Sequence, residues 1–502
     1  MAIITVNGVR QDVPTGSLVS SIIHPPHALE MPCAGRGQCG KCRVVAHGAL
    51  SSPSAEERIH LTEQELENGV RLACCCSIEG DCAISLTENA ASQILLTGKL
   101  PAFERNPGFT SYGIAMDLGT TTIAGCLYDA EGTLIAQSSA PNPQIQWGAD
   151  VISRIEAALM GHAVSLSASI RNEISKMILQ LSAKALISPD QIEKIVLTGN
   201  TVMLFLLTQT DSECLSHAPF TASRLFGENI PAAELDLPCP DADVFLPRCI
   251  SAFIGADITT ALLASSIYKG KGTHALMDIG TNGEIALWHN GKLFCCSTAA
   301  GPAFEGVGLH MGMTGKAGAI DRVYRNGDTL EGHVIGCVSP RGICGSGVVD
   351  AIASLLEMGL LSSSGVLKYD PTEIMPPVCI TQNDIRMIQM AKSAICSGLL
   401  TLFKVGGVSS HDIAQVSIAG GFGSYLDVAN AGRIGLFPEE LIDKVHILGN
   451  AALSGAIMLL LNQDLVSEAQ TVAENAVTID LSSNSVFFNL YTENMFFDSE
   501  NE

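Results

Sequence analysis

The chain has 502 residues, of which 47% are hydrophobic and 16% are charged, and its formal net charge at pH 7 is −23. This composition is typical of a globular protein with more than one domain and excludes a disordered chain. The acidic balance argues against nucleic-acid binding, which requires basic patches. The longest apolar run near the end, over residues 451–461, is interrupted by Ser454 and Gly455 and is too short to span a bilayer.

The 17 cysteines raise the question of disulfide bonds. Their number is odd, the chain is long, and its first residues lead directly into a strand pattern without the features of a secretory signal. We therefore expect a protein of the reducing cytoplasm, in which clustered cysteines are metal ligands.

Residues 1–88 predict a small sheet domain of the β-grasp type. Asn7 and Gly8 separate two short alternating runs, which is a strong hairpin signal. Thr62 and Glu65 have the spacing of a capping box, which predicts a helical turn. The expected strands cover residues 2–6, 9–13, 42–46, 70–73 and 82–86, and the expected helical segments cover residues 17–23 and 63–67.

A glycine-rich loop in this region carries three cysteines, and a fourth follows later in the chain. The four candidate ligands are Cys33, Cys39, Cys42 and Cys74, with the spacing C-x5-C-x2-C-x31-C. This spacing resembles that of ferredoxins with a [2Fe–2S] cluster. The plant-type loop has one residue fewer in its first gap, so the match is to the adrenodoxin-type variant.

The fourth ligand is open because Cys74, Cys75 and Cys76 are contiguous. Cys74 is preferred, since the Arg-Leu-Ala-Cys segment that ends in it resembles the one that supplies the last ligand in such ferredoxins. The alternative is a structural Zn²⁺ held by four cysteines. Zinc sites usually pair their cysteines as two C-x2-C units, and only one such unit occurs here, so the iron–sulfur interpretation is favoured.

After a predicted linker over residues 89–110, two segments repeat the pattern of a strand, a polar glycine turn and a second strand. The backbone N–H groups and hydroxyls of such turns bind phosphate oxygens, and the aspartate that ends the first strand can hold Mg²⁺. The candidate ATP and Mg²⁺ residues in these turns are Asp117, Gly119, Thr120, Thr121, Asp278, Gly280, Thr281 and Asn282.

A third turn contains Gly420 and Gly421 after an apolar strand and suits the close approach of a flat ring. The three turns together resemble the phosphate 1, phosphate 2 and adenosine motifs of the ASKHA superfamily, which holds acetate kinase, sugar kinases, heat-shock chaperone ATPases and actin. The resemblance implies two related α/β lobes that close on Mg-ATP. We therefore expect an α+β and α/β multidomain chain. Its expected parts are a [2Fe–2S] ferredoxin-like domain (1–88), the linker (89–110), a first lobe (111–268) and a second lobe (269–495).

Asp257 follows another glycine turn between the two phosphate motifs. Its carboxylate could serve as a catalytic base or as a ligand to a Mg²⁺-bound water. The favoured interpretation is the N-cap of a helix, and no other catalytic residue is assigned. Helices are expected over residues 150–158 and 164–187, and a connecting strand is expected to end at Gly199 and Asn200.

A ferredoxin-like domain followed by such an ATPase resembles the reductive activators of corrinoid-dependent methyltransfer systems, the RACo-type ATPases. The resemblance extends over nearly the whole chain and includes the cysteine loop, both phosphate turns and the segments 142–154 and 301–306. It implies one-electron reduction of inactive Co(II) to Co(I) on a corrinoid protein, driven by ATP. It further implies a low-potential electron donor and a homodimer.

Three alternatives stay open from the sequence. The first is a kinase of the same superfamily with a regulatory cluster, although no sugar or acid pocket is identifiable. The second is a redox sensor in which nucleotide and cluster only set partner binding. The third, an activator of 2-hydroxyacyl-CoA dehydratases, fits less well because that family lacks an N-terminal β-grasp domain. The methyl donor of the partner system leaves no trace in the sequence.

Overall fold

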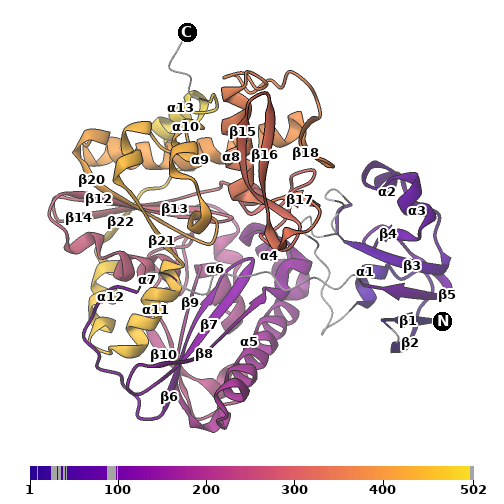
Figure 1. The fold of residues 1–502 in the computed structure, drawn as a ribbon. Coiled ribbons are helices and arrows are strands. Elements are labelled where there is room, and N and C mark those ends of the chain that lie inside the picture. The colour runs from indigo at the N-terminus through magenta and orange to yellow at the C-terminus, as the bar shows by residue number, and fades with distance from the viewer. Residues whose placement is uncertain are drawn as a thin grey trace.

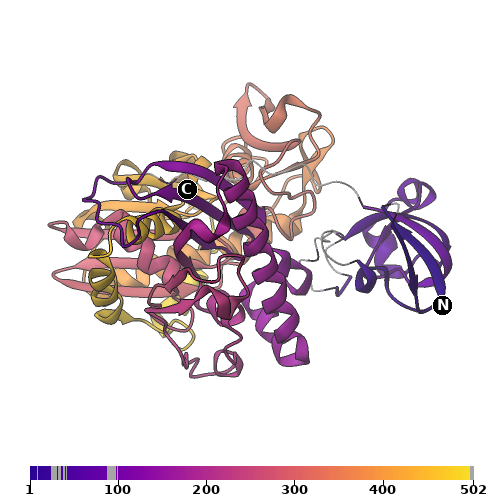
Figure 2. The same cartoon turned by 90° about the horizontal axis from the view of Figure 1, so that it is seen from below.

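The computed structural model describes residues 1–7, 9–23, 31, 35–37, 40, 42–86, 98 and 100–497. A small N-terminal sheet lies beside a larger body of two sheets and their helices (Figures 1 and 2). Within these ranges no helix has both the length and the apolar character needed to cross a membrane.

The N-terminal sheet has the strand order β2-β1-β5-β3-β4, in which β1 and β5 are parallel and the other pairs antiparallel. This is the order expected of a β-grasp domain. Alternating side chains such as Ile4, Val44 and Ile84 face a core closed by α1. The elements are β1 (Ala2–Val6), β2 (Val9–Val13), α1 (Val19–Ile22), β3 (Arg43–Leu50), α2 (Ala55–His60), α3 (Glu63–Glu67), β4 (Val70–Leu72) and β5 (Ile78–Ser85).

Helix α2 was not expected from the sequence, although Ser54 and Glu57 form a capping box at its start. Glu57 is fully buried, and its carboxylate accepts two hydrogen bonds of 2.8 Å from the Arg71 guanidinium. It also accepts from the backbone N–H groups of Ser54 and Leu72. These bonds attach α2 to β4, directly before the predicted ligand Cys74.

The second half of the predicted linker packs on the larger body. Asn106 pairs with Asn462 in a short β-bridge, and the Asn462 side chain donates to the carbonyl of Glu104 at 2.8 Å. Phe109 is 5% exposed. These contacts are not apparent from local sequence patterns, because they are made with residues more than 350 positions away. The domain boundaries themselves stay a prediction.

The first large sheet has the order β10-β11-β9-β6-β7-β8. Its outer face is covered by α4, α5 and α6, and their apolar side chains form one core with the strands. The expected helices over 150–158 and 164–187 are α4 (Val151–Ala157) and α5 (Ala163–Ala185). The other elements are β6 (Tyr112–Leu118), β7 (Thr122–Asp129), β8 (Leu134–Pro141), β9 (Ile192–Gly199), α6 (Thr201–Thr208), β10 (Glu228–Pro231) and β11 (Asp243–Leu246).

The second large sheet repeats this plan in the order β21-β20-β12-β13-β14-β22. Helices α8 and α9 cover its outer face. Its elements are β12 (Thr273–Ile279), β13 (Gly283–His289), β14 (Lys292–Thr298), β20 (Ile413–Ala419), β21 (Val445–Gly449), β22 (Ala476–Thr478), α8 (Gly345–Glu357) and α9 (Gln382–Gly406). The three-stranded meanders β6-β7-β8 and β12-β13-β14 occupy equivalent places in the two sheets. The two similar turns of the sequence therefore lie at equivalent positions in the two lobes.

Helices α7 (Ala256–Ser265) and α11 (Ala451–Leu461) lie between the two sheets, and their apolar residues share a core with both. Their backbones come very close, since a Cβ on Gly455 would lie 1.9 Å from the carbonyl oxygen of Thr260. The resulting five layers, helices–sheet–helices–sheet–helices, are visible in Figure 1.

A smaller sheet, β16-β15-β17, projects from the second lobe towards the N-terminal sheet (Figure 1). Its strands are β15 (Ala319–Asn326), β16 (Thr329–Val334) and β17 (Gly342–Ile343). The remaining elements of the C-terminal half are β18 (Thr372–Met375), β19 (Val378–Ile380), α10 (Val428–Arg433), α12 (Leu465–Glu474) and α13 (Ser485–Glu493).

Candidate functional site

A cavity of about 480 Å³ lies where the two lobes meet. The turns after β6 and β12 enter it from opposite lobes, and the hydroxyls of Thr120 and Thr281 approach to 3.1 Å. All ten residues predicted to bind ATP or Mg²⁺ line this cavity. They are Asp117, Gly119, Thr120, Thr121, Asp278, Gly280, Thr281, Asn282, Gly420 and Gly421.

The first phosphate turn is fixed from behind. The Asn142 side chain donates to the carbonyl of Gly119 at 2.8 Å, and the guanidinium of the fully buried Arg154 donates to the carbonyl of Thr120. Neither Asn142 nor Arg154 lines the cavity. Both are therefore positioning residues that hold the turn while its hydroxyls face the cavity.

The third glycine turn touches the second phosphate motif. Gly420 has a φ of +96°, and a Cβ there would lie 2.8 Å from the Asp278 carboxylate and 2.6 Å from the carbonyl of Ile279. A Cβ on Gly421 would meet no atom within 4 Å. Glycine is thus required at 420 by packing, whereas at 421 it leaves the cavity open.

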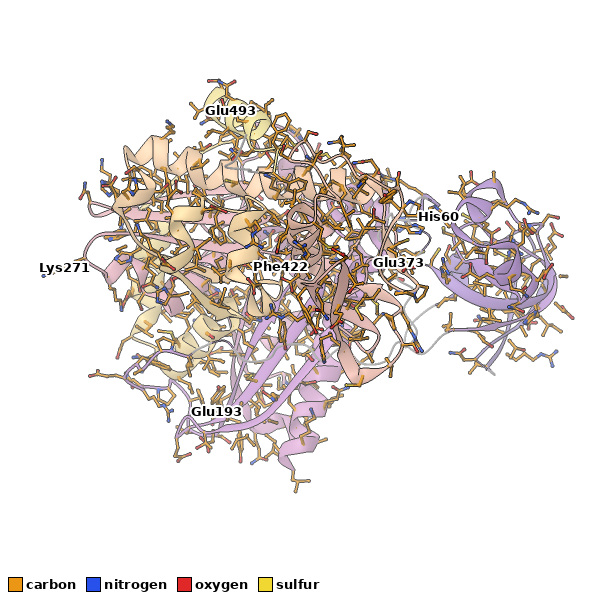
Figure 3. All side chains as sticks on the ribbon, turned by 45° about the horizontal axis from the view of Figure 1, so that its top comes forward. His60, Glu193, Lys271, Glu373, Phe422 and Glu493 are labelled. Carbon is orange, nitrogen blue, oxygen red and sulfur yellow. The ribbon has the colours of Figure 1, made fainter. Side chains whose placement is uncertain are left out.

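Aromatic side chains lie beside the third turn. Phe422 stacks on Phe304 with ring centroids 5.0 Å apart, and Phe422 and Tyr425 line the cavity. In Figure 3 Phe422 lies near the centre of the two-lobed body. Such rings, together with the start of α8 at Gly345 and Ser346, suit a flat base and its sugar.

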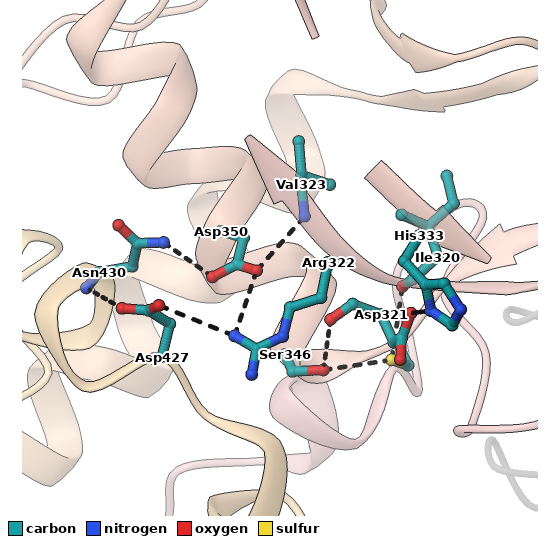
Figure 4. A network of polar contacts seen from close by, with 10 residues as sticks. Ile320, Asp321, Arg322, Val323, His333, Ser346, Asp350, Asp427 and Asn430 are labelled. Carbon is teal, nitrogen blue, oxygen red and sulfur yellow. Dashed lines mark hydrogen bonds and ion pairs between the residues drawn. The ribbon is translucent and has the colours of Figure 1, made fainter. Parts of the chain in front are cut away.

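The wall next to these rings is a polar network that joins β15, β16, α8 and α10 (Figure 4). The Ser346 hydroxyl donates to the carbonyl of Asp321 at 2.9 Å, and the Asp321 carboxylate contacts His333 at 2.6 Å. Arg322 lies 3.8 Å from both Asp350 and Asp427. The network links the cavity wall to α10, which follows the third glycine turn.

Six carboxylates line the cavity, and no lysine or arginine is among its lining residues in the described part of the chain. Burial raises the pKa of Asp117 to about 6. Burial and the negative charges of Asp117 and Glu305 raise the pKa of Asp278 to about 7. The pKa values of Asp257 and Glu284 are also raised, first by burial and then by neighbouring carboxylates.

The interpretation of Asp257 as an N-cap is wrong. The N-cap of α7 is Gly255, and Asp257 lies in the first turn of the helix and lines the cavity. Its carboxylate accepts from the N–H of Ile258 at 2.8 Å. A Cβ on Gly255 would lie 2.6 Å from the Cα of Asn200, so a capping side chain at 255 would collide with that backbone.

Two asparagines that sequence reasoning did not assign to the site cross the cleft in the same way. Asn200 caps α6 through its side-chain oxygen, and its amide nitrogen lies 3.4 Å from the Glu284 carboxylate. Asn450 caps α11, and its amide nitrogen donates to Asp117 at 2.9 Å. A sequence signal exists, because each asparagine follows a strand that ends in glycine, at 199 and at 449.

The cysteine site is described only in part. Cys33 and Cys39 lie outside the described residues. The Sγ atoms of Cys42 and Cys74 are 3.3 Å apart, and both cysteines are buried. The backbone N–H of Gly37 donates to the Cys74 sulfur, a contact typical of cluster ligands.

The neighbouring cysteines differ in their surroundings. The Cys75 sulfur lies 3.5 Å from that of Cys74, and a Cβ on Gly37 would lie 3.1 Å from it. Cys76 is fully buried and receives a hydrogen bond from Ser51. Cys42 and Cys74 are thus close enough to ligate one metal centre.

The carboxylate site fits a hydrated cation. Within the described ranges no group of three or more His, Cys, Asp or Glu side chains is arranged to hold a metal ion alone. Mg²⁺ does not need such a cage, because it retains waters and takes one or two carboxylates plus substrate phosphates. Asp117 and Asp278 below the phosphate turns match this requirement.

Comparisons with known proteins agree with this architecture. Models of the "RACo middle region" and of the "C-terminal domain of RACo the ASKHA domain" match residues 112–270 and 273–502. The corrinoid activation enzyme RamQ of Eubacterium limosum is 35% identical over 418 residues, which cover 77% of this chain and 70% of that protein. The Co(II) methylated amine-specific corrinoid protein reductase of Methanosarcina barkeri is 26% identical, with 76% of each chain covered.

Among solved structures, a reductive activator for corrinoid, iron-sulfur protein superposes with a TM-score of 0.72. It is 24% identical, and the match covers 99% of this chain and 98% of that one. At this identity the match shows the fold, and it confirms the predicted two-lobed architecture. On the strength of the family models and the relative in E. limosum, the chain belongs to the RACo family, whose C-terminal domain is an ASKHA domain.

Proposed function

We propose that this protein is an ATP-dependent reductive activator of a corrinoid protein, which restores inactive Co(II) to Co(I) by one-electron transfer in a methyltransfer system. The names of the relatives in E. limosum and M. barkeri support the acceptor class. The single structural observation that carries the proposal is the cavity between the lobes, with its phosphate turns and uncompensated carboxylates.

Mg-ATP suits the electrostatics of this cavity. A nucleoside triphosphate beside Asp117, Asp278 and Glu284 adds negative charge where burial and neighbouring carboxylates already disfavour it, so a cation favours its binding. In the absence of lysine and arginine from the described lining residues, Mg²⁺ is the group that would neutralise both sides. The hydroxyls of Thr121 and Thr281 and the turn N–H groups would then hold phosphate oxygens.

A [2Fe–2S] cluster on Cys33, Cys39, Cys42 and Cys74 would supply the single electron that the cobalt accepts. Gly37 positions the Cys74 sulfur through its N–H, and Cys42 lies next to it. The buried ion pair of Glu57 and Arg71 holds the strand that leads to Cys74. A low-potential donor in the cytoplasm would reduce the chain again after each transfer.

ATP can drive an unfavourable electron transfer only if two states of the protein bind it differently. The lobes offer such states, because the phosphate turns belong to different sheets and meet across one cavity. Closure on Mg-ATP and release after hydrolysis would therefore bias the complex with the corrinoid protein.

The test is an anaerobic assay with the full chain, a chemical reductant, Mg-ATP and a Co(II) corrinoid protein, followed by the visible spectrum of the cobalt. We expect Co(I) to appear only with Mg-ATP. Equal formation of Co(I) without ATP would contradict the coupling, and phosphorylation of a small molecule would favour the kinase alternative.

A matched pair of variants tests the cluster. Cys74→Ser should abolish both the rhombic EPR signal of the reduced protein and Co(I) formation. Cys76 lies two positions away, and its thiol is hydrogen-bonded to Ser51, so Cys76→Ser should retain both the signal and the activity. Stoichiometric zinc without iron in the purified protein would refute the iron–sulfur assignment.

A further inference from the structure

Glu305 joins the two phosphate turns across the cleft. Its carboxylate accepts a hydrogen bond from the Thr281 hydroxyl at 2.9 Å and a second from the Thr121 hydroxyl. Thr121 belongs to the turn between β6 and β7 of the first lobe, and Thr281 belongs to the turn between β12 and β13 of the second. One anionic side chain therefore accepts a hydrogen bond from one hydroxyl of each lobe.

The segment that carries Glu305 is held firmly. It is a short 3-10 helix, Pro302–Glu305, that ends at Gly306, where φ is +73°. A Cβ on Gly306 would lie 2.2 Å from the carbonyl of Met313, and a Cβ on Gly345 would lie 1.7 Å from that of Phe304. The backbone is thus locked against α8 and the loop at 313, so the Glu305 side chain is the part that can move.

A carboxylate bound to two hydroxyls occupies the place that a phosphate oxygen would take. Both groups are anionic acceptors of charge-assisted hydrogen bonds, so they compete for the same donors. They also repel each other, and the surrounding carboxylates add to that repulsion. With the base beside the third glycine turn, the proposed binding mode brings the terminal phosphate to both phosphate turns and an inner phosphate to one of them.

We propose that Glu305 is an anionic latch: it holds the two phosphate turns together in the nucleotide-free chain and yields their hydroxyls to the terminal phosphate of ATP. The latch makes the cleft discriminate ATP from ADP, because only a ligand that contacts both turns replaces both lost hydrogen bonds. It rests on the proposed function in so far as the cavity binds nucleotide. Glu305 acts through Thr121 and Thr281 and is therefore a positioning residue for the lobes.

The first test measures binding by calorimetry with Mg²⁺ and a non-hydrolysable ATP analogue, and separately with Mg-ADP. Glu305→Gln and Glu305→Ala remove the competing charge, so both should bind the ATP analogue about tenfold more tightly and Mg-ADP less than about twofold more tightly. Glu373→Gln, which removes an exposed charge from the same lobe (Figure 3), should match the wild type. Unchanged or weaker binding of the ATP analogue by both Glu305 variants would overturn the latch.

The second test needs no nucleotide. Hydrogen exchange of the turns around Thr121 and Thr281 should be faster in Glu305→Ala than in the wild type, and unchanged in Glu373→Gln. Equal exchange in all three proteins would also overturn the latch. A merely structural role for Glu305 predicts faster exchange together with weaker nucleotide binding. If the wild type binds no Mg-ATP, the proposed function and the latch both fail. If it binds Mg-ATP but the Glu305 variants do not bind the ATP analogue more tightly, the latch alone fails.

Discussion

Two buried glutamates show how differently the N-terminal sheet and the nucleotide cleft treat charge. Glu57 is fully buried, and Arg71 compensates it with two hydrogen bonds of 2.8 Å. Glu284 is 7% exposed and has Asn200 at 3.4 Å, while its titratable neighbours, Asp257 and Asp278, are also carboxylic acids.

The titration of the two groups reflects this difference. Burial raises the pKa of Glu57, but the bonds from Arg71, Ser54 and Leu72 outweigh it, so the pKa is lowered overall. Burial and like charges act in the same direction on Glu284, whose pKa is raised well above its ordinary value. A buried charge with a partner of opposite charge, such as Glu57 with Arg71, holds elements of the fold together. A set of uncompensated carboxylates suits the binding of a cation.

The largest expected effect comes from breaking the compensated pair. Arg71→Ala leaves the Glu57 carboxylate buried without a cation, which should destabilise the N-terminal sheet by about 3–5 kcal/mol. Arg58→Ala is the matched control, since Arg58 on α2 pairs with Glu63 at the surface. Its loss should cost at most about 1 kcal/mol. Hydrogen exchange in urea over residues 43–85 measures both, and similar losses in the two variants would contradict the distinction.

In the cleft, removing a charge should affect ligand binding and not folding. Asp278→Asn should weaken Mg-ATP binding about a hundredfold, equivalent to about 2.7 kcal/mol, because a candidate Mg²⁺ ligand is lost. The same substitution relieves repulsion, so the melting temperature of the metal-free protein should rise or stay constant. Asp328→Asn, at an exposed turn, should change neither quantity. A fall in melting temperature would show that Asp278 is structural.

The capping asparagines sharpen the comparison because the same residue type occurs with and without a carboxylate partner. Asn450→Ala removes a helix cap and the 2.9 Å hydrogen bond to Asp117, so we expect a loss of about 2–3 kcal/mol. Asn484→Ala removes only the cap of α13 and should cost about 1 kcal/mol. Thermal unfolding measures both. Equal losses would mean that the bond to Asp117 contributes nothing.

The sequence predicted the parts of this site that are local. The twin turns are short and repeat a pattern, so Asp117 and Asp278 could be found without coordinates, and all ten predicted nucleotide residues line one cavity. Asn450 and Glu305 were missed because their roles depend on which strands of the two lobes face each other. A comparison of the Gly-Asn pairs at 199–200 and 449–450 would have found Asn450.

The errors have equally specific causes. Asp257 was interpreted as an N-cap because aspartate favours that position, whereas the close approach of Asn200 leaves room only for glycine at the cap. Helix α2 was overlooked because a six-residue helix has too few turns for an apolar period, although its capping box was present. The roles of Cys33 and Cys39 stay a prediction, as they lie outside the described residues.

The smallest expected effect is a pH dependence of the N-terminal sheet. Because the folded-state pKa of Glu57 is lowered, its contribution to stability is present above its ordinary pKa of 4.5 and is lost as the pH falls through the folded value. Glu57→Gln should therefore show a shallower loss of stability than the wild type below about pH 4.5. Urea unfolding of residues 43–85 by hydrogen exchange, at several pH values with Glu63→Gln as an exposed control, measures the slope. A wild-type slope no steeper than that of Glu57→Gln would mean that the Arg71 pair does not control the titration of Glu57, and the contrast with the cleft would then rest on geometry alone.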